Sequence, residues 1–238
     1  LFIDISKASV NKEVEYVICK NLINLFLFNL NTNCKIICLH QNFIKRLKFI
    51  GINLKKISVF YTHTKIEYTH IKLLKEIKNI FVMNSTEINN LKVFGLEDKK
   101  IELFTTGYDE KLFNRKNKKR DIDFLFVCKF VDRKKQHYYW NRKNMSLLIN
   151  LAEKLRQKGY KVLVMGKNWD RKDQLFKFQT LDIKHSEYPD IYNRSKIYIS
   201  TSLQEGGPVS WIEAMASGCY TLSHQTGFAS ELRDKELM

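Results

Sequence analysis

The stretch KIYISTSLQEGGPVSWIEAMASG, which runs from Lys196 to Gly218, is the most informative part of the sequence for the fold. Its first six residues alternate apolar and polar side chains as a strand does, and Pro208 is a favourable first residue for a helix. The pattern therefore predicts a strand, a glycine turn and a helix. Gly206 and Gly207 let the backbone approach a ligand closely. The helix start, with unpaired N–H groups and a positive dipole end, favours an anion such as a diphosphate.

Two glutamates belong to this motif. Glu205 stands before the turn, and Glu213 follows eight positions later inside the predicted helix. Glu213 lies roughly a turn and a half past Pro208, where its carboxylate could accept two hydrogen bonds from a diol such as that of a ribose. The alternative is that Glu205 is a loop charge and Glu213 a solvated helix residue. Because the neighbours of Glu213 are nearly all apolar, we favour a buried helix whose carboxylate needs a partner.

Composition indicates a globular protein. The 238 residues are 44% hydrophobic and 13% aromatic, which excludes a disordered chain. The sequence does not begin with Met, and its last residues, ELRDKELM, stop without an obvious terminal element, so we expect a fragment. The net charge of +16 makes nucleic acid, an anionic membrane and a phosphorylated substrate candidate partners. The charge is spread over both halves and no nucleic-acid-binding module is recognisable, which argues against nucleic acid.

The cysteines and the apolar segments point to the cytoplasm. Five cysteines without CxxC spacing are typical of reduced, buried thiols. The apolar run at residues 22–30 is too short to span a bilayer, and no signal peptide is visible. We expect a cytoplasmic protein, and the dispersed lysines leave room for peripheral contact with the anionic inner face of a membrane.

Strands alternate with helices along the chain, which predicts parallel βαβ units. Ser85 is a candidate cap for the expected helix at 86–94, and Gly95 lies just beyond the end of that helix. The almost entirely polar segment at 114–121 places a domain boundary between residues 117 and 118. We therefore expect α/β architecture with two Rossmann-like doubly wound domains, 1–117 and 118–238, and a ligand cleft between them. The expected strands are 35–40, 57–62, 79–84, 100–105, 123–130, 160–166 and 196–201, and the expected helices are 14–26, 66–77, 86–94, 145–158, 189–195 and the one after 207.

Several motifs in order resemble group 1 (family 4) glycosyltransferases, which have the GT-B fold. In the second half they are FLFVCKF, RKNMSLLINLAEKL, YKVLVMGK, IYNRSKIYISTS and EGGPVSWIEAMASG; in the first half, the stretch from NIFVMNSTEINN to GYDEKLF is similar to the approach to the domain boundary. The E-x7-E spacing of Glu205 and Glu213 matches that family's signature. The resemblance implies a metal-independent, retaining, hexosyltransferase-like enzyme of polysaccharide biosynthesis. It would use a nucleotide sugar and a glycan or lipid-linked acceptor, without a cofactor.

The same resemblance assigns roles to residues. It implies that Glu205 and the N–H groups of Gly206 and Gly207 hold the donor sugar, and that Glu213 binds the ribose. Lys129 and Lys143 stand where the family has two basic residues that neutralise the diphosphate, and fixed cations would stabilise that leaving group without a metal. His63 resembles the family's histidine near the reaction centre, with His40 as a rival.

The departures from the family pattern leave alternatives open. The insertion FVDRKKQHYYWNRKN lies between the two lysines, so Arg133, Lys134 or Arg142 could replace either as a phosphate ligand. The pair Asp121 and Asp123 precedes a strand, and we interpret it as a boundary turn rather than a metal-binding D-x-D. The alternative functions are an inactive GT-B accessory protein, a related epimerase or phosphorylase, and a basic nucleic-acid binder.

Overall fold

The computed structural model describes residues 36–38, 43–61, 68–96, 100–104, 107–170, 172–227 and 229. The chain divides into two compact units, residues 1–105 and 106–238. Within the described residues, no helix is long and apolar enough to cross a membrane.

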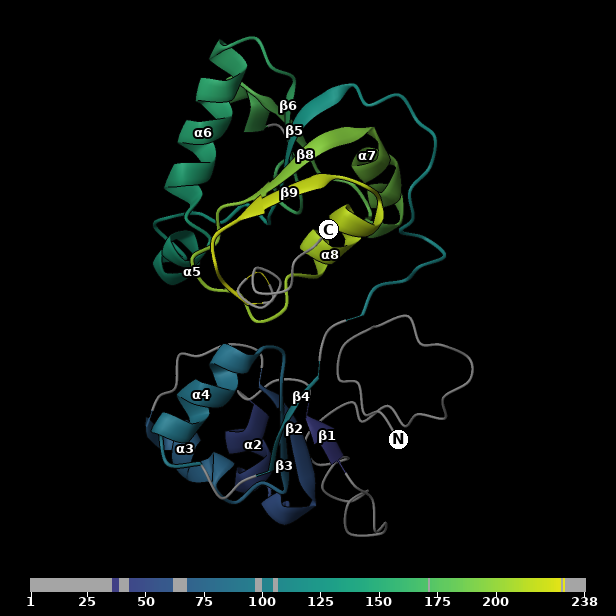
Figure 1. The fold of residues 1–238 in the computed structure, drawn as a ribbon. Coiled ribbons are helices and arrows are strands. Elements are labelled where there is room, and N and C mark those ends of the chain that lie inside the picture. The colour runs from purple at the N-terminus through teal and green to yellow at the C-terminus, as the bar shows by residue number, and fades with distance from the viewer. Residues whose placement is uncertain are drawn as a thin grey trace. The chain divides into compact units, whose positions relative to one another are not determined.

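The first unit carries a parallel sheet with strand order β1-β2-β3-β4 (Figure 1). Alternate residues of β2 are buried and form the centre of the core: Ile57, Val59 and Tyr61. This sheet confirms the βαβ pattern expected from residues 35–105; the short helix α2 in it was not predicted. The elements are β1 (Ile36–Cys38), α2 (Ile44–Phe49), a 3-10 turn (Leu54–Lys56), β2 (Ile57–Tyr61), α3 (Tyr68–Leu74), β3 (Asn79–Val82), α4 (Ser85–Val93) and β4 (Lys100–Leu103).

The cap of α4 differs from the prediction by one residue. Asn84 is the cap, because its side chain accepts a hydrogen bond from the backbone N–H of Glu87 at 3.1 Å. Ser85 is the first helical residue, so the assignment of the cap to Ser85 is wrong. The predicted end is confirmed: Gly95 has a φ of +76°, a left-handed conformation that glycine adopts without steric cost.

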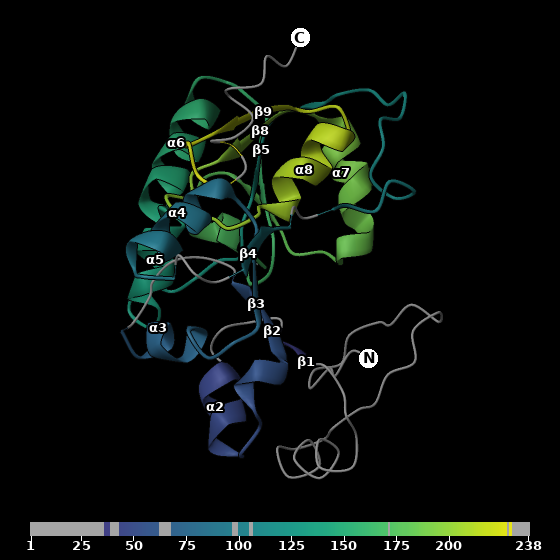
Figure 2. The ribbon, with the colours of Figure 1, turned by 60° about the horizontal axis from the view of Figure 1, so that its bottom comes forward.

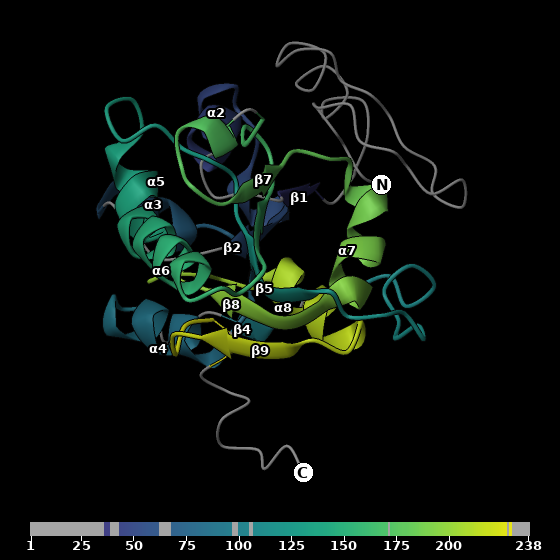
Figure 3. The same ribbon diagram turned by 90° about the horizontal axis from the view of Figure 1, so that it is seen from above.

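The second unit carries a parallel sheet with strand order β7-β6-β5-β8-β9. Helix α6 covers one face of the sheet, and α7 and α8 cover the other (Figures 2 and 3). Helix α5, β7 and β9 were not predicted. The elements are β5 (Ile122–Val127), α5 (His137–Arg142), α6 (Met145–Gln157), β6 (Val162–Met165), a 3-10 turn (Lys172–Gln174), β7 (Gln179–Leu181), a second 3-10 turn (His185–Glu187), α7 (Tyr188–Arg194), β8 (Ser195–Ser200), α8 (Val209–Ala216) and β9 (Tyr220–Ser223).

The strand order of this second sheet reverses at β5. The chain first builds outward from β5 to β6 and β7, and then crosses to β8 and β9 on the other side. The carboxyl ends of β5 and β8 therefore flank a topological switch point. In open α/β sheets, ligands bind at such a point, beyond the strand ends.

A buried tryptophan fixes the backbone just after β5. Trp169 is fully buried in the core beneath α6, and its indole N–H donates to the carbonyl oxygen of Cys128 at 2.6 Å. Gly166 also lies against this carbonyl group, since a Cβ placed on Gly166 would be 2.4 Å from the Cys128 oxygen. Both contacts hold the exit of β5 in one position.

The boundary between the units lies before the polar segment, between residues 105 and 106. Phe113 is only 2% exposed and belongs to the core beneath α7 and α8. The side chain of Asn193 on α7 accepts a hydrogen bond from the backbone N–H of Lys116 at 2.6 Å and donates one to the carbonyl oxygen of Asn114 at 3.0 Å. Residues 107–117, which were predicted to belong to the first domain, thus pack with the second unit.

Candidate active site

Two backbone contacts bring the turn between α5 and α6 against the loop that follows β8. The hydroxyl of Thr201 donates to the carbonyl oxygen of Lys143 at 3.0 Å, and the backbone N–H of Leu203 donates to the carbonyl oxygen of Arg142 at 2.8 Å. Asn144 turns the chain into α6 with a φ of +49°, a left-handed conformation that asparagine tolerates better than most residues. The predicted phosphate-binding lysine therefore faces the glutamate motif.

Lys143 and Glu205 form an ion pair in this junction. The ammonium group of Lys143 donates to Oε1 of Glu205, and the two side chains are 24% and 13% exposed. Burial alone would raise the pKa of Glu205, but the charge and hydrogen bond of Lys143, together with a hydrogen bond from Ser202, bring that pKa below its usual value. Glu205 is therefore a carboxylate at neutral pH.

A second loop, at residues 226–227, contacts the backbone at Glu205 and Gly206. The backbone N–H of Glu205 donates to the hydroxyl of Thr226 at 2.9 Å. A Cβ placed on Gly227 would lie 2.9 Å from the carbonyl oxygen of Gly206, so only glycine allows this approach. The backbone between β8 and α8 is thus in contact with two other segments, the turn between α5 and α6 and residues 226–227.

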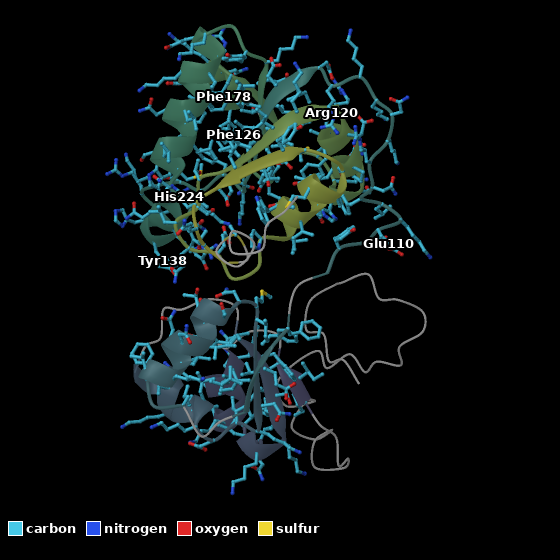
Figure 4. All side chains as sticks on the ribbon, viewed as in Figure 1. Glu110, Arg120, Phe126, Tyr138, Phe178 and His224 are labelled. Atoms are coloured by element: carbon cyan, nitrogen blue, oxygen red, sulfur yellow. The ribbon has the colours of Figure 1, made fainter. Side chains whose placement is uncertain are left out.

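A pocket of about 250 Å³ opens at this place. Val127 ends β5 and Ser200 ends β8, so the pocket lies at the switch point of the sheet. In Figure 4, Tyr138 of α5 and His224, just past β9, mark the same edge of the sheet. The lining residues are Val127, Lys143, Tyr198, Ser200, Ser202, Glu205, Gly207, Pro208, Val209 and Ser210.

The start of α8 forms part of the pocket wall. The helix begins at Val209, and Pro208 is its N-cap rather than its first residue. Proline has no side-chain acceptor, and no side-chain hydrogen bond caps this end, which leaves N–H groups of the first turn available to an anion. Neither Gly206 nor Gly207 has a positive φ, so their contribution here is the lack of a side chain.

Glu213 lies within α8 and is 2% exposed. His185, in the 3-10 turn before α7, shares a hydrogen bond of 2.8 Å between its Nε2 and Oε1 of Glu213. The hydroxyl of Tyr192 on α7 donates to Oε2 at 3.3 Å, and burial raises the pKa of Tyr192 well above its usual value, so this hydroxyl stays protonated. The apolar neighbours of Glu213 in the sequence predicted a buried carboxylate in need of a partner, and the structure supplies two, His185 and Tyr192.

His185 was not among the predicted site residues. Its ring contacts Phe113 and Tyr188, with centroid separations of 5.2 and 5.1 Å. It also borders a second pocket of about 460 Å³, lined by Lys167, Asp182, Ile183, Lys184, His185, Glu187 and Tyr188. A histidine just before a predicted helix carries no signal in sequence, because its partner lies 28 residues further along the chain.

The other predicted phosphate ligands differ in their exposure. Lys129 is exposed and does not line the pocket of Lys143 and Glu205. Among the alternatives, Arg133 and Lys134 are exposed, whereas Arg142 is half-buried and its Nε is a buried donor without a hydrogen-bond partner in the described residues. His63 and its rival His40 lie outside the described residues.

Three observations concern metals and nucleophiles. Asp121 and Asp123 pair with Arg194 and Lys196 at 2.8 and 2.7 Å, at the edge where β5 begins. No three His, Cys, Asp or Glu side chains gather into a metal-binding group within the part of the chain that the structure describes. Burial raises the pKa of Cys128 to about 11, so its thiol is protonated at neutral pH.

Comparison with known proteins decides the family of the second unit. Residues 123–237 match the family model described as glycosyl transferases group 1. The second unit belongs to the group 1 glycosyltransferases. The matched stretch includes Lys143, Glu205 and Glu213, and it leads from β5 through α8. None of the curated proteins matches the chain significantly in sequence.

Solved glycosyltransferase structures share the fold of both units. A mutant of TarM from S. aureus, in complex with Fondaparinux, alpha-GlcNAc-glycerol and UDP, has a TM-score of 0.63 at 18% identity over 88% of this chain. Sucrose-phosphate synthase from Thermosynechococcus elongatus has a TM-score of 0.66 at 15% identity over 87%. Trehalose-6-phosphate synthase from E. coli, bound with UDP-2-fluoro glucose, has a TM-score of 0.64 at 12% identity over 88%. The fold of the chain is thus GT-B, and the chain spans 46%, 60% and 63% of these structures.

Proposed function

We propose that this protein transfers a sugar from a nucleotide-sugar donor, with retention of the anomeric configuration, to a glycan or lipid-linked acceptor. The observation that carries the proposal is the pocket at the switch point, where Lys143 and Glu205 meet the start of α8. In the reaction, the bond between the anomeric carbon and the diphosphate oxygen breaks. The acceptor oxygen bonds to that carbon, and its proton leaves with the nucleoside diphosphate.

Positive charge around the pocket suits the leaving group. A diphosphate gains negative charge as the glycosidic bond breaks, so fixed donors and cations near it lower the barrier. Lys143 is the cation of the pocket itself, and Arg142 contributes a buried Nε that lacks a partner in the described part of the chain. The N–H groups at the start of α8 add the positive end of the helix dipole. We propose Lys143 and Arg142 as the diphosphate ligands, with the exposed Lys129 in a lesser role.

The two glutamates would divide the rest of the donor between them. Glu205 is a carboxylate at neutral pH and lines the pocket, where it can accept hydrogen bonds from sugar hydroxyls. Glu213 is held by His185 and Tyr192 on the side of the second pocket, and we assign it to the ribose. The second pocket then lies where the base would follow. His63 remains a proposed residue of the reaction centre, to be tested by substitution.

Thermal unfolding with nucleotides tests the proposal. UDP, GDP and ADP are titrated separately, and one of them at ~100 times its dissociation constant should add about 2.7 kcal/mol to the free energy of unfolding. Glu213→Gln should weaken that nucleotide at least tenfold, whereas Glu110→Gln, a change of the same type at an exposed carboxylate, should leave binding unchanged.

Turnover separates the roles of the glutamates. Glu205→Gln should reduce release of the nucleoside diphosphate more than it weakens nucleotide binding. If none of the three nucleotides stabilises the protein, the donor site is misassigned. If a nucleotide binds normally and no donor sugar is ever released, the chain is an accessory protein and not a transferase.

A further inference from the structure

A basic pocket of about 680 Å³ lies at the edge of the second sheet where β5 and β8 begin and β6 is entered. This is the edge opposite the candidate active site, and a six-residue strand separates the two by about 20 Å. Figure 4 shows Arg120 at one end of the sheet and Tyr138 and His224 at the other. Six cationic and two acidic side chains line this basic pocket: Lys118, Lys119, Arg120, Lys161, Arg194, Lys196, Asp121 and Asp123.

Ion pairs account for half of the cations. Arg194 donates two hydrogen bonds to the carboxylate of Asp121, at 2.9 and 2.8 Å, and this pairing holds the pKa of Asp121 at about 2. Lys196 binds Asp123 at 2.7 Å. The third pair joins Lys118 to Asp190, which stands on α7. Three cations are thus matched by three carboxylates.

The other three cations have no carboxylate partner among the described residues. Arg120 donates to two backbone carbonyl oxygens, of Ser195 at 2.6 Å and of Ser217 at 3.3 Å, and these neutral acceptors leave its charge uncompensated. Lys119 and Lys161 are exposed at the rim. The basic pocket therefore carries an excess of three positive charges.

Part of the pocket is fixed before any ligand arrives. The guanidinium groups of Arg120 and Arg194 are both half-buried and tied by hydrogen bonds to the protein. Fixed cations lose little side-chain entropy on binding, and the lysines at the rim can reach toward a ligand. A hollow with a rigid floor and mobile cations at its rim suits a compact, highly charged anion.

We propose that the basic pocket binds an anion with two or more phosphate groups, either a soluble polyphosphate compound or the headgroup of a phospholipid. One phosphate monoester carries a charge of about −1.5 to −2 at neutral pH. A phosphodiester, as in a phospholipid headgroup, carries only about −1, so at least two phosphates are needed against three cations. This site is separate from the donor diphosphate site and adds to the proposed function.

Matched charge variants test the proposal. Lys119→Gln combined with Lys161→Gln removes two cations that have no carboxylate partner, so no buried charge is left uncompensated. Lys154→Gln combined with Arg156→Gln removes the same charge from the exposed side of α6 and is the control. Both should melt within a degree or two of the parent protein.

Binding is measured with inorganic tripolyphosphate by calorimetry, and with phosphatidylcholine vesicles with and without cardiolipin, which carries two phosphates. The pocket variant should weaken tripolyphosphate at least tenfold, and the control less than twofold. The comparison is repeated on a Lys143→Gln background, so that the candidate active site does not supply the signal. Retention on cardiolipin vesicles that depends on Lys119 and Lys161 identifies a lipid headgroup as the source, and its absence identifies a soluble ligand.

Three outcomes would overturn the proposal. Equal weakening by the pocket and control variants would mean diffuse attraction to a basic protein. No measurable binding of either probe by the parent protein would mean a solvated surface. Tighter binding of duplex DNA, lost in the pocket variant, would make the region a nucleic-acid surface instead.

Discussion

Replacing Lys143 with methionine should destabilise the second unit and raise the pKa of Glu205. The ion pair is partly buried, with side chains 24% and 13% exposed. Breaking a fully buried pair costs roughly 3–5 kcal/mol, whereas exposed pairs contribute roughly 0.2–1 kcal/mol. For Lys143→Met we therefore expect a loss of about 2 kcal/mol at pH 7. In a unit of this size, that corresponds to a melting temperature lower by about 8 °C.

The dependence on pH follows from the direction of the pKa shift. The folded protein holds the pKa of Glu205 below its ordinary 4.5. The pair therefore contributes its full stability above pH 4.5, and that contribution is lost as the pH falls through the folded value. The difference between Lys143→Met and the parent protein should accordingly be large at pH 7 and shrink as the pH drops below 4.5.

Tryptophan fluorescence makes the assay specific. All three tryptophans, Trp140, Trp169 and Trp211, lie in the second unit, so their emission follows the unfolding of that unit alone. A double-mutant cycle with Glu205→Gln should give a coupling energy of at least about 1 kcal/mol. Lys154→Met, on the exposed side of α6, is the control and should change little. Additive effects of Lys143→Met and Glu205→Gln, or equal effects at pH 7 and pH 3, would refute this account of the pair.

Three further predictions use the same unit. Gly166→Ala should cost at least about 2 kcal/mol in chemical denaturation, because its φ is +139° and the new Cβ would meet the Cys128 carbonyl oxygen at 2.4 Å; Gly159→Ala, with open space around it, should cost less, and equal costs would contradict the steric argument. Asp121 has a folded pKa of about 2 against an ordinary 3.8, so its stabilisation is present above pH 3.8 and lost toward pH 2; Asp121→Asn should flatten that part of the acid limb in a series of melting curves, and an unchanged slope would count against the pairing with Arg194. His185→Ala should weaken nucleotide binding about fivefold, or about 1 kcal/mol, because Glu213 loses a hydrogen-bond partner. His185→Gln should restore most of the binding. If both variants lower the melting temperature and neither changes nucleotide binding, His185 is purely structural.

Much of the fold could be predicted from the sequence because the central strands are buried. β5 and β6 lie under helices on both faces, so their apolar runs stand out against polar flanks. Edge strands lack this signal. β9 exposes Tyr220 by 80%, and its alternation is too weak to distinguish it from a loop. Helix α5 buries none of its residues, so no apolar periodicity marks it.

The domain boundary differs from the predicted one because contacts distant in sequence determine it. Residues 114–121 are almost entirely polar and are typical of a linker. They nevertheless pack against the second unit, because the preceding Phe113 lies in its core and Asn193 forms hydrogen bonds with their backbone. One apolar residue and one asparagine distant in sequence decide the packing, and neither is conspicuous within a window of ten residues.

The candidate site was predicted in its parts but not in its contacts. The spacing of Glu205 and Glu213 predicted both carboxylates and the helix that carries Glu213, because short-range geometry follows from sequence distance. The partners come from elsewhere in the chain. Lys143 lies 62 residues before Glu205, and the hydrogen bonds of Thr201 and Leu203 to its turn determine that they meet.

The two glutamates differ in what a bound donor must change. Lys143 already binds Glu205, so a diphosphate that recruits Lys143 competes with an existing ion pair, and part of its binding energy offsets that loss. Glu213 is different. A carboxylate offers about four lone-pair positions, and His185 and Tyr192 occupy one on each oxygen. Under the proposed assignment, the remaining position on each oxygen would accept one of the two hydroxyls of a ribose, and His185, whose side chain is 60% exposed, would mark the side of their approach. Nucleoside without phosphate should therefore engage Glu213 without disturbing Lys143, whereas free diphosphate should loosen the Lys143–Glu205 pair.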